Sequence, residues 1–260
     1  MLLAINANNT NCKFALFDDG EKIGDWRIST RATRTADEYA VWLSQLMALV
    51  GRVPADVTSA IIAIVVPQAL FELKVLCKKY FHCTPLVVGE PDVDLGIQVL
   101  LDQPQEAGAD RLVNAVAAHG MYGGPLVVVD FGTSTTFDIV DSAGDYVGGI
   151  IAPGVNLSVD ALYVAAAKLP RIAVEKADRV IGKNTVEAMK SGVFWGYVGL
   201  IEGLIDRICG EMACDGVKVI ATGGLAPLFF DSTDHLQILD PDLTMKGLVE
   251  IHRRNAKARP

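Results

Sequence analysis

Hydrophobic and polar positions alternate at the start of the chain in a pattern that predicts three consecutive strands. A short apolar run, residues 2–5, ends in asparagine-rich turn residues. Residues 13–18 then alternate, which is typical of a strand with one buried face. The pair Asp19-Gly20 favours a tight turn, and residues 22–28 form the third predicted strand. The chain therefore opens with a β-meander.

Helical spacing follows the meander and gives the first half of the chain a mixed α/β order. Thr35 and Glu38 have the S/T-x-x-E spacing of a capping box at a helix start. Apolar side chains behind them recur on one helical face: Tyr39, Leu43, Leu46, Met47 and Val50. We expect next a buried strand at residues 59–65, a helix at 67–80 and a strand at 85–88.

The same order begins again near residue 123. An apolar run at residues 125–129 is followed by the polar segment DFGTSTT and by predicted strands at residues 137–140 and 146–151. The remaining pattern predicts helices at 155–169, 186–209 and 243–255 and strands at 217–221 and 236–239. Within the longest of these helices, residues 193–205 are apolar on more than one face, so burial in a core and burial in an interface both stay open.

The two halves match each other at a constant offset of 124 residues. At this offset the following positions agree in type without a gap: Asn6 with Asp130, Asn8 with Gly132, Thr10 with Ser134, Leu16 with Val140, Gly20 with Gly144, Ile23 with Val147, and Gly24 with Gly148. Matches in the same strand–turn–strand context indicate an internal duplication. We therefore expect an α/β fold of two lobes, residues 1–122 and 123–260, that face each other across a cleft.

Charge and composition argue against several classes of protein. The 260 residues carry a formal net charge of −8, which argues against nucleic-acid binding because such proteins present a basic face. The basic residues at 252–260 are interpreted as a solvated chain end. The most apolar run, residues 60–67, is far shorter than the roughly 20 residues of a membrane span. Five cysteines without a CxxC spacing favour reduced thiols and a cytoplasmic location over disulfides or a zinc site.

The polar turn after the first strand of each half is the strongest candidate for chemistry. Such a turn exposes several backbone N–H groups at one point, and its hydroxyl side chains add donors, so it can bind phosphate. An aspartate at its first position can hold a cation through oxygen. Each turn taken alone favours an ordinary tight hairpin, whereas the pair of turns favours phosphate binding.

Motifs that follow one another along the chain carry a resemblance that covers essentially the whole sequence. INANNTNCKF and DFGTSTTFD resemble the two phosphate motifs of the acetate kinase–sugar kinase–actin superfamily, and ATGGLA resembles its adenosine motif. More narrowly, AGADRLVNA, DFGTSTTFDIV, GGIIAPG and GKNTVEAMKSGVFWGYVGLIEG resemble type III pantothenate kinases, also called the Bvg accessory factor family. The resemblance implies two duplicated ribonuclease H-like, actin-like lobes.

The resemblance also implies an activity and its partners. Members phosphorylate pantothenate with ATP in the first step of coenzyme A synthesis, use Mg²⁺ and a monovalent cation, K⁺ or NH₄⁺, and form homodimers that share a substrate site. The implied ATP-binding residues are Asn6, Asn8, Asn9, Thr10, Asn11, Lys13, Thr133, Gly223 and Gly224. The implied pantothenate-binding residues are Gly108, Ala109, Asp110, Arg111 and, across the dimer, Thr185. Asp110 is the implied general base, and Asp130 the implied ligand of the monovalent cation.

Structural interpretations compete with two of these roles. Asp110 and Arg111 could instead cap a helix and form a surface ion pair. Asn184 and Thr185 precede a predicted helix, with Glu187 three residues after Asn184, so Thr185 could serve in helix capping as well as in binding.

The first phosphate motif departs from the family pattern D-x-G-N-T-N. Asn6 replaces the aspartate and Asn8 the glycine. Asn8 tolerates a left-handed turn, but Asn6 lacks the negative charge that attracts Mg²⁺ or its water shell. In addition, residues 95–107 contain no aromatic residue where the family often has a substrate-binding tyrosine. A variant or engineered chain, a protein that binds without turnover, and an active enzyme with altered metal use all fit these departures.

The sequence thus leaves more than one function open. A pantothenate kinase is the leading hypothesis. A non-catalytic nucleotide- or pantothenate-binding accessory protein follows from Asn6, and a kinase of another small acyl or sugar substrate remains a third alternative.

Overall fold

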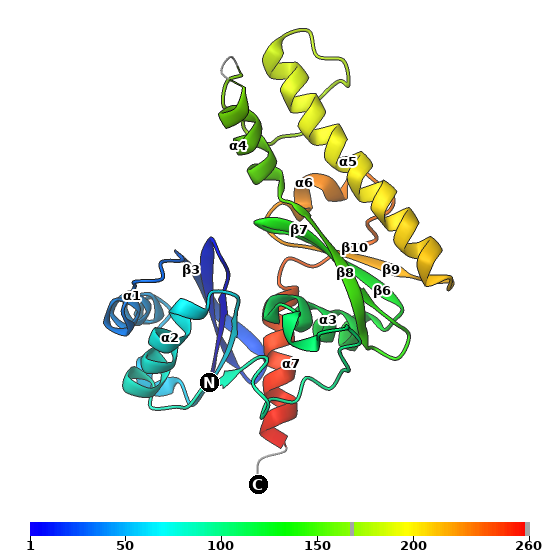
Figure 1. Cartoon of the computed structure of the whole chain (residues 1–260). Helices are drawn as coiled ribbons and strands as arrows, with labels where there is room; N and C mark the ends of the chain where they lie inside the picture. Colours follow the sequence, from blue (N-terminus) through cyan, green and yellow to red (C-terminus); the bar gives the residue numbers. More distant parts are fainter. Residues whose placement is uncertain (167–168, 258–260) are drawn as a thin grey trace. The chain divides into compact units, whose positions relative to one another are not determined.

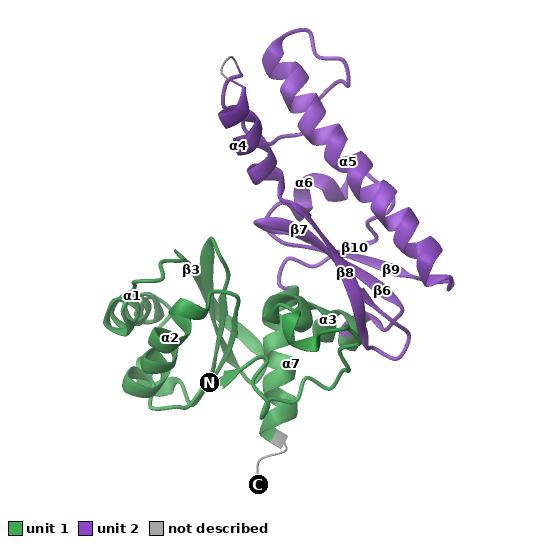
Figure 2. Cartoon of the chain, viewed as in Figure 1, with its two compact units in different colours: residues 1–120, 243–260 green, residues 121–242 purple. Residues whose placement is uncertain are grey.

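A computed structural model describes residues 1–166 and 169–257. The chain divides into two compact units (Figure 2). Unit 1 contains Met1–Gly120 together with Leu243–Pro260, and unit 2 contains Met121–Asp242.

Unit 1 is built on a five-stranded sheet in the order β3-β2-β1-β4-β5. The strands are β1 (Leu2–Ala7), β2 (Asn11–Asp18), β3 (Glu21–Ser29), β4 (Ser59–Ile64) and β5 (Leu86–Val87). The first three pair antiparallel, as the alternating pattern predicts, whereas β4 and β5 run parallel to β1. The continuous apolar sequence of β4 fits this parallel position, because a central parallel strand is buried on both faces.

Helices cover both faces of this sheet (Figure 1). Leu3 and Ile5 of β1 belong to the core cluster beneath α1 (Ala36–Leu49) and α2 (Pro67–Tyr80). Leu2 and Ala4 belong to the cluster beneath α3 (Ala109–Tyr122) and α7 (Leu243–Lys257). The predicted capping box of α1 is confirmed. The Thr35 hydroxyl accepts from the backbone N–H of Glu38, and the Glu38 carboxylate accepts from the backbone N–H of Thr35. Two short 3-10 helices, Pro54–Asp56 and Pro104–Glu106, lie in the connections.

Unit 2 repeats the architecture with a sheet in the order β10-β9-β6-β7-β8. Its strands are β6 (Leu126–Phe131), β7 (Ser134–Val140), β8 (Tyr146–Pro153), β9 (Lys218–Thr222) and β10 (Ile238–Leu239). One face packs against α4 (Val155–Ala165), α5 (Thr185–Met212) and α6 (Ala226–Phe230). Helix α4 ends earlier than the predicted helix 155–169, of which residues 167–168 lie outside the described residues.

The duplication is visible in the pairing of the strands, but the ungapped offset of 124 is wrong within the meander. Asn6 lies opposite Lys13, whereas Asp130 lies opposite Thr136, so β2 and β7 correspond at an offset of 123. The β-bulges agree, since they fall after Leu16 and after Ile139. The first polar turn therefore holds one residue more than the second, and Leu16 corresponds to Ile139 rather than to Val140.

Helix α7 corrects the predicted division into residues 1–122 and 123–260. It follows unit 2 in sequence, yet Met245, Leu248 and Ile251 pack into the core of unit 1. A sequence boundary drawn from an internal repeat misses this arrangement, because the repeat identifies equivalent elements and not the sheet on which each one packs.

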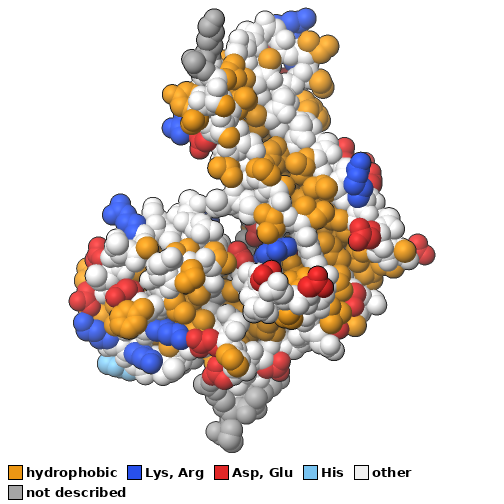
Figure 3. Space-filling view, in the orientation of Figure 1, with side chains coloured by type: hydrophobic (Ala, Val, Ile, Leu, Met, Phe, Trp, Pro, Cys, Tyr) orange, Lys and Arg blue, Asp and Glu red, His pale blue; other side chains and the backbone are white. Residues whose placement is uncertain are grey.

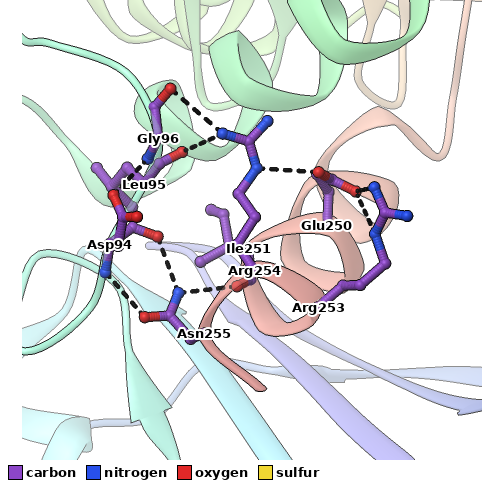
Figure 4. Close-up of polar contacts among 8 residues, drawn as sticks. All are labelled: Asp94, Leu95, Gly96, Glu250, Ile251, Arg253, Arg254 and Asn255. Atoms are coloured by element: carbon purple, nitrogen blue, oxygen red, sulfur yellow. Dashed lines mark hydrogen bonds and ion pairs between the residues drawn. The ribbon is translucent and has the colours of Figure 1, made fainter. Parts of the chain in front are cut away.

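Polar contacts fix the end of α7 to unit 1 (Figure 4). Oδ1 of the buried Asn255 accepts from the N–H of Asp94 at 2.9 Å, and its Nδ2 donates to the carbonyl of Asp94 at 2.8 Å. Arg254 donates to the carbonyls of Leu95 and Gly96 and to Glu250. The interpretation of residues 252–260 as a solvated end is therefore wrong for Arg254 and Asn255, while residues 258–260 lie outside the described residues. Among the described helices, none combines the length and the apolar character needed to cross a bilayer.

Candidate active site

The first polar turn of unit 1 joins β1 to β2. Ala7 pairs with Cys12, and the N–H of Asn8 donates to the carbonyl of Asn11 at 3.0 Å, which closes the turn. Asn9 and Thr10 are exposed at its tip. The structure thus places Asn6, Asn8, Asn9, Thr10, Asn11 and Lys13 together at one end of the sheet, in the arrangement expected of a phosphate turn.

Two amide oxygens in this turn are buried without a partner. Oδ1 of Asn6 and Oδ1 of Asn8 accept no hydrogen bond from any described residue. Only 7% of the Asn6 surface is exposed. Such an oxygen has lost its water without gaining a donor, and this costs free energy unless a ligand supplies one. Nearby, Lys13 forms an ion pair with Asp25 at 3.2 Å.

Helix α3 begins on the same face of the sheet as Asn6. Side chains alternate along a strand, so Asn6 shares a face with Leu2 and Ala4, which pack in one cluster with Ala109 of α3. Gly108 precedes the helix, and its carbonyl accepts from the N–H of Leu112 at 3.1 Å. The first turn of α3 thus carries Asp110 and Arg111 on the side of unit 1 toward which Asn6 faces.

Asp110 is a carboxylate held in a fixed position. Its Oδ1 accepts from the backbone N–H of Arg111 at 2.9 Å. A β-carbon at Gly108 would lie 2.8 Å from the same oxygen, so glycine leaves room for the carboxylate. Burial raises the pKa of Asp110, and the Arg111 N–H and guanidinium oppose this rise. Asp110 lies inside the first turn of the helix rather than at its cap, so it does not fill the capping role considered from sequence.

The second polar turn, in unit 2, joins β6 to β7 and is tighter than the first. The N–H of Gly132 donates to the carbonyl of Ser134 at 3.0 Å, and Thr133 is exposed at the tip. Asp130 lies at the end of β6, between Thr136 of β7 and Thr222 of β9. The turn and Asp130 are thus adjacent, as the motif predicts.

The adenosine motif of unit 2 packs directly onto this end of β6. Gly223 has φ +91°, and a β-carbon there would lie 2.4 Å from Oδ1 of Asp130 and 2.7 Å from the N of Phe131. Only glycine fits both this conformation and this contact. Gly224 is exposed beside it. The structure therefore brings Asp130, Gly132, Gly223 and Gly224 together within unit 2.

Thr185 lies apart from the other predicted residues of unit 2, at the first position of α5. Asn184 is the N-cap: its Oδ1 accepts from the N–H of Glu187 at 2.9 Å, and Glu187 accepts from Nδ2 of Asn184 at 2.8 Å. Capping at this helix start is confirmed for Asn184 and Glu187. The side chain of Thr185 is exposed.

Sequence reasoning missed one buried acid beside the second turn. Asp138 is fully buried on β7 and accepts from the hydroxyl of Tyr146 at 2.9 Å and from that of Thr136 at 3.2 Å. Thr136 and Asp138 share the strand face of Asp130, because Asp130 lies directly opposite Thr136. Thr136 and Asp138 alternate with the apolar Phe137 and Ile139, and this local alternation is the signal that marks the face.

Two solved structures share this fold at low sequence identity. A conserved protein from Campylobacter jejuni, described as a proposed Baf family transcriptional activator, is 20% identical with a TM-score of 0.60, covering 98% of this chain and 99% of that chain. A proposed 2-dehydro-3-deoxygalactonokinase from Sinorhizobium meliloti is 15% identical with a TM-score of 0.59, covering 98% and 96%. The duplicated sheet with a polar turn after each first strand is that of the sugar kinases and actin-like ATPases.

Sequence comparison resolves the family within this class. The family model described as type III pantothenate kinase matches residues 2–207. A curated type III pantothenate kinase from Rhodospirillum rubrum is 60% identical over 255 residues, covering 98% of this chain and 99% of the relative. The chain belongs to the type III pantothenate kinase family and, as a member, is a kinase of pantothenate.

Proposed function

We propose that this chain transfers the γ-phosphoryl group of ATP to the primary hydroxyl of pantothenate and releases ADP and 4′-phosphopantothenate. This reaction is the first step of coenzyme A biosynthesis. The observation that carries the proposal is Asp110, a half-buried carboxylate of raised pKa fixed at the start of α3 within a chain of this family. Phosphoryl transfer needs little covalent chemistry from the protein, so positioning and charge neutralisation dominate.

The polar turns supply the positioning groups in this proposal. Backbone N–H groups and side chains of Asn6, Asn8, Asn9, Thr10, Asn11 and Lys13 in unit 1, and Thr133 in unit 2, bind the phosphates. Gly223 and Gly224 lie against the adenosine. The exposed backbone at Gly224 supports this role, since glycine lets backbone approach a flat ring. Turn amides bind phosphate with few positive side chains, which agrees with the net charge of −8.

Asp110 acts as the general base, and Arg111 binds the pantothenate carboxylate. The hydroxyl oxygen of pantothenate forms the new bond to the γ-phosphorus as the bond from that phosphorus to the ADP oxygen breaks. The hydroxyl proton passes to the Asp110 carboxylate. A raised pKa favours this transfer, because a more basic carboxylate takes a proton more readily. The guanidinium of Arg111 offers a forked pair of donors that fits a carboxylate, and Gly108 and Ala109 line the same segment.

Different residues are proposed to contact Mg²⁺ and the monovalent cation. Mg²⁺ prefers oxygen ligands and keeps several waters, so the buried oxygens of Asn6 and Asn8 suit contact with its water shell. They are neutral, however, and no described group of three or more His, Cys, Asp or Glu side chains is arranged to hold a metal. Because Mg²⁺ in kinase sites usually binds through substrate phosphates and keeps several waters, the ATP phosphates hold it in this proposal. Asp130 is the ligand proposed for the monovalent cation, K⁺ or NH₄⁺.

A homodimer with a shared substrate site completes the proposal, with Thr185 contacting pantothenate bound to the partner subunit. Its support is the apolar surface of unit 2 around α4 and the start of α5, where orange side chains gather in Figure 3. The exposed apolar residues there are Leu157, Leu162, Tyr163, Val164, Val180, Ile181 and Val186. Exposed apolar side chains that gather in one region are typical of an interaction site. Sedimentation equilibrium tests it: a dimer is expected, and a monomer at micromolar concentration would contradict the shared site.

We also propose a cytoplasmic location, supported by the five cysteines, none of which forms a disulfide.

An assay that couples ADP release to pantothenate tests the activity. With ATP, Mg²⁺ and K⁺ present, ADP release is expected to depend on pantothenate. The neutral Asn6 favours one second candidate, an accessory protein that binds nucleotide or pantothenate without turnover. That candidate predicts ligand-induced thermal stabilisation with no ADP release in the wild-type chain.

A further inference from the structure

Thr30 holds the first polar turn from both sides. Its hydroxyl donates to the carbonyl of Asn8 at 2.5 Å, and its backbone N–H donates to the carbonyl of Thr10 at 3.0 Å. Thr30 is the residue that follows β3, so it reaches the turn across the neighbouring β2 strand. These two bonds occupy carbonyls on either side of Asn9 and fix the direction in which the turn presents its N–H groups.

Unit 2 places a residue against its own turn from the same position in the fold. Ser29 pairs with Asn11 on β2, and the equivalent pair in unit 2 is Pro153 with Ser134. The next residues, Thr30 and Gly154, therefore correspond. A β-carbon at Gly154 would lie 2.1 Å from the carbonyl oxygen of Thr133 and 3.0 Å from that of Gly132. The backbone of Gly154 thus packs against the second turn, at the position where the Thr30 side chain forms a hydrogen bond with the first turn.

The hydroxyl of Thr30 is itself held by a second layer of contacts. Sγ of Cys12 lies 3.4 Å from Oγ1 of Thr30 and 3.7 Å from the hydroxyl of Tyr39. Tyr39 and Cys12 are fully buried in the core beneath α1. A hydroxyl fixed by such neighbours stays in one rotamer, so the turn is held by the rigid core of unit 1 rather than by its own flexible residues.

We propose that Thr30 is a positioning residue for ATP, which holds the Asn8–Thr10 backbone in the conformation that binds phosphate before the nucleotide arrives. The inference rests on the proposed role of this turn in ATP binding. It assigns no contact between Thr30 and the nucleotide itself. Pre-organisation of this kind raises affinity because the free protein has already lost the conformational freedom of the turn.

Three variants of the full-length chain test the inference. Thr30→Val removes the hydroxyl and keeps the shape, and Thr30→Ser keeps the hydroxyl. Thr58→Val is the matched control, since Thr58 also donates its hydroxyl to a backbone carbonyl, that of Met1 at 3.2 Å, at the end of β1 opposite the first polar turn. For each variant, the Kd for a non-hydrolysable ATP analogue is measured by titration calorimetry, and the KM values for ATP and pantothenate are measured by ADP release.

Thr30→Val is expected to weaken binding of the analogue and to raise the KM for ATP, each about fivefold. This is the change that the loss of one hydrogen bond causes. The KM for pantothenate should change less than twofold, and Thr30→Ser should restore both ATP values. Equal behaviour of Thr30→Val and wild type, failure of Thr30→Ser to restore binding, or equal shifts in both KM values would overturn the inference. Because the Kd needs no turnover, a chain that binds the analogue but forms no product refutes the proposed activity and still tests Thr30.

Discussion

Gly223 packs its backbone against the carboxylate of Asp130, at a distance that excludes any side chain. A β-carbon there would lie 2.4 Å from Oδ1 of Asp130, and the φ of +91° is one that other residues rarely adopt. The contact joins the start of the adenosine motif to the end of β6, the strand that leads into the second polar turn. The geometry of the proposed nucleotide site in unit 2 therefore depends on this one glycine.

Replacing Gly223 by alanine is expected to lower the free energy of unfolding by about 1–3 kcal/mol, from steric overlap and from strain at positive φ. Nucleotide affinity should fall with it. Gly210→Ala, in α5 of the same unit and outside the proposed nucleotide site, is the matched control, because no described atom outside its own helix backbone lies within 4 Å of the added carbon and its φ is not positive. Thermal unfolding and analogue binding measure both effects, and an equal response of the two variants would refute the role given to the Gly223 contact.

Asp110→Asn is expected to reduce kcat about 10²–10⁴-fold, the usual contribution of a general base. In the wild type, kcat/KM for pantothenate should fall on acidification at a pH above the ordinary aspartate pKa of about 4, because burial raises the pKa of Asp110. A pH–rate profile measures this. A profile flat from pH 5 to 8 together with an active Asp110→Asn variant would exclude Asp110 as the base.

The same substitution should stabilise the fold at neutral pH. A carboxyl whose pKa is raised by folding binds its proton more tightly in the folded state, so its charged form costs stability above the folded pKa. Asn carries no charge, and the variant should therefore melt at a higher temperature than wild type at pH 7. The difference should shrink as the pH falls through the raised pKa. Thermal melts at pH 7 and pH 4.5 give both values, and a destabilised variant at pH 7 would contradict the sign.

Asn6→Asp tests the departure in the first phosphate motif. The Asn6 side chain is buried, and its Oδ1 has no partner among the described residues, so a charge placed there without metal should lower the melting temperature. Bound Mg²⁺ and nucleotide should reverse the loss, and the Mg²⁺ concentration for half-maximal activity should fall. Asn9→Asp, at the exposed tip of the same turn, controls for added charge. Identical Mg²⁺ dependence in wild type and Asn6→Asp would show that this position does not act on the metal.

Asn255→Ala tests the attachment of α7 to unit 1. It removes the bonds to both backbone groups of Asp94 and the bond to the carbonyl of Ile251, and it leaves the N–H of Asp94 without its acceptor. The free energy of unfolding should fall by about 2 kcal/mol. Arg253→Ala, which removes only an exposed ion pair with Glu250, should change it by less than about 0.5 kcal/mol. Urea unfolding measures both free energies, and an unchanged free energy of unfolding in Asn255→Ala would refute the attachment.

The local sequence predicted elements better than it predicted their packing. Apolar alternation in residues 13–18 and the Thr35–Glu38 spacing depend on neighbours in the chain, and the structure contains the corresponding strand and capped helix. The position of α7 on unit 1 depends on contacts such as Asn255 with Asp94, 161 residues away, which no local pattern encodes. The extra residue in the first turn likewise became visible only through the pairing of Asn6 with Lys13.

The same distinction holds for the candidate site: some of its residues could be predicted from the sequence and others could not. The resemblance of DFGTSTTFD and ATGGLA to family motifs implied that Asp130 and Gly223 belong to phosphate and adenosine segments, and the structure brings the two residues into contact within unit 2. Thr30 carries no motif, and its two bonds to the first turn arise because β3 ends beside that turn. Residues that act through backbone carbonyls are hidden from pattern analysis, since many side chains could make the same bond.

Direct detection of the product tests the central claim. Isotope-labelled pantothenate is incubated with ATP, Mg²⁺ and K⁺, and the reaction of the wild-type chain and of Asp110→Asn is followed by mass spectrometry and by ADP release. The wild type is expected to form 4′-phosphopantothenate and ADP in equal amounts, and Asp110→Asn is expected to form neither at a comparable rate. A folded wild-type chain that binds the ATP analogue and yet forms no phosphopantothenate would contradict it.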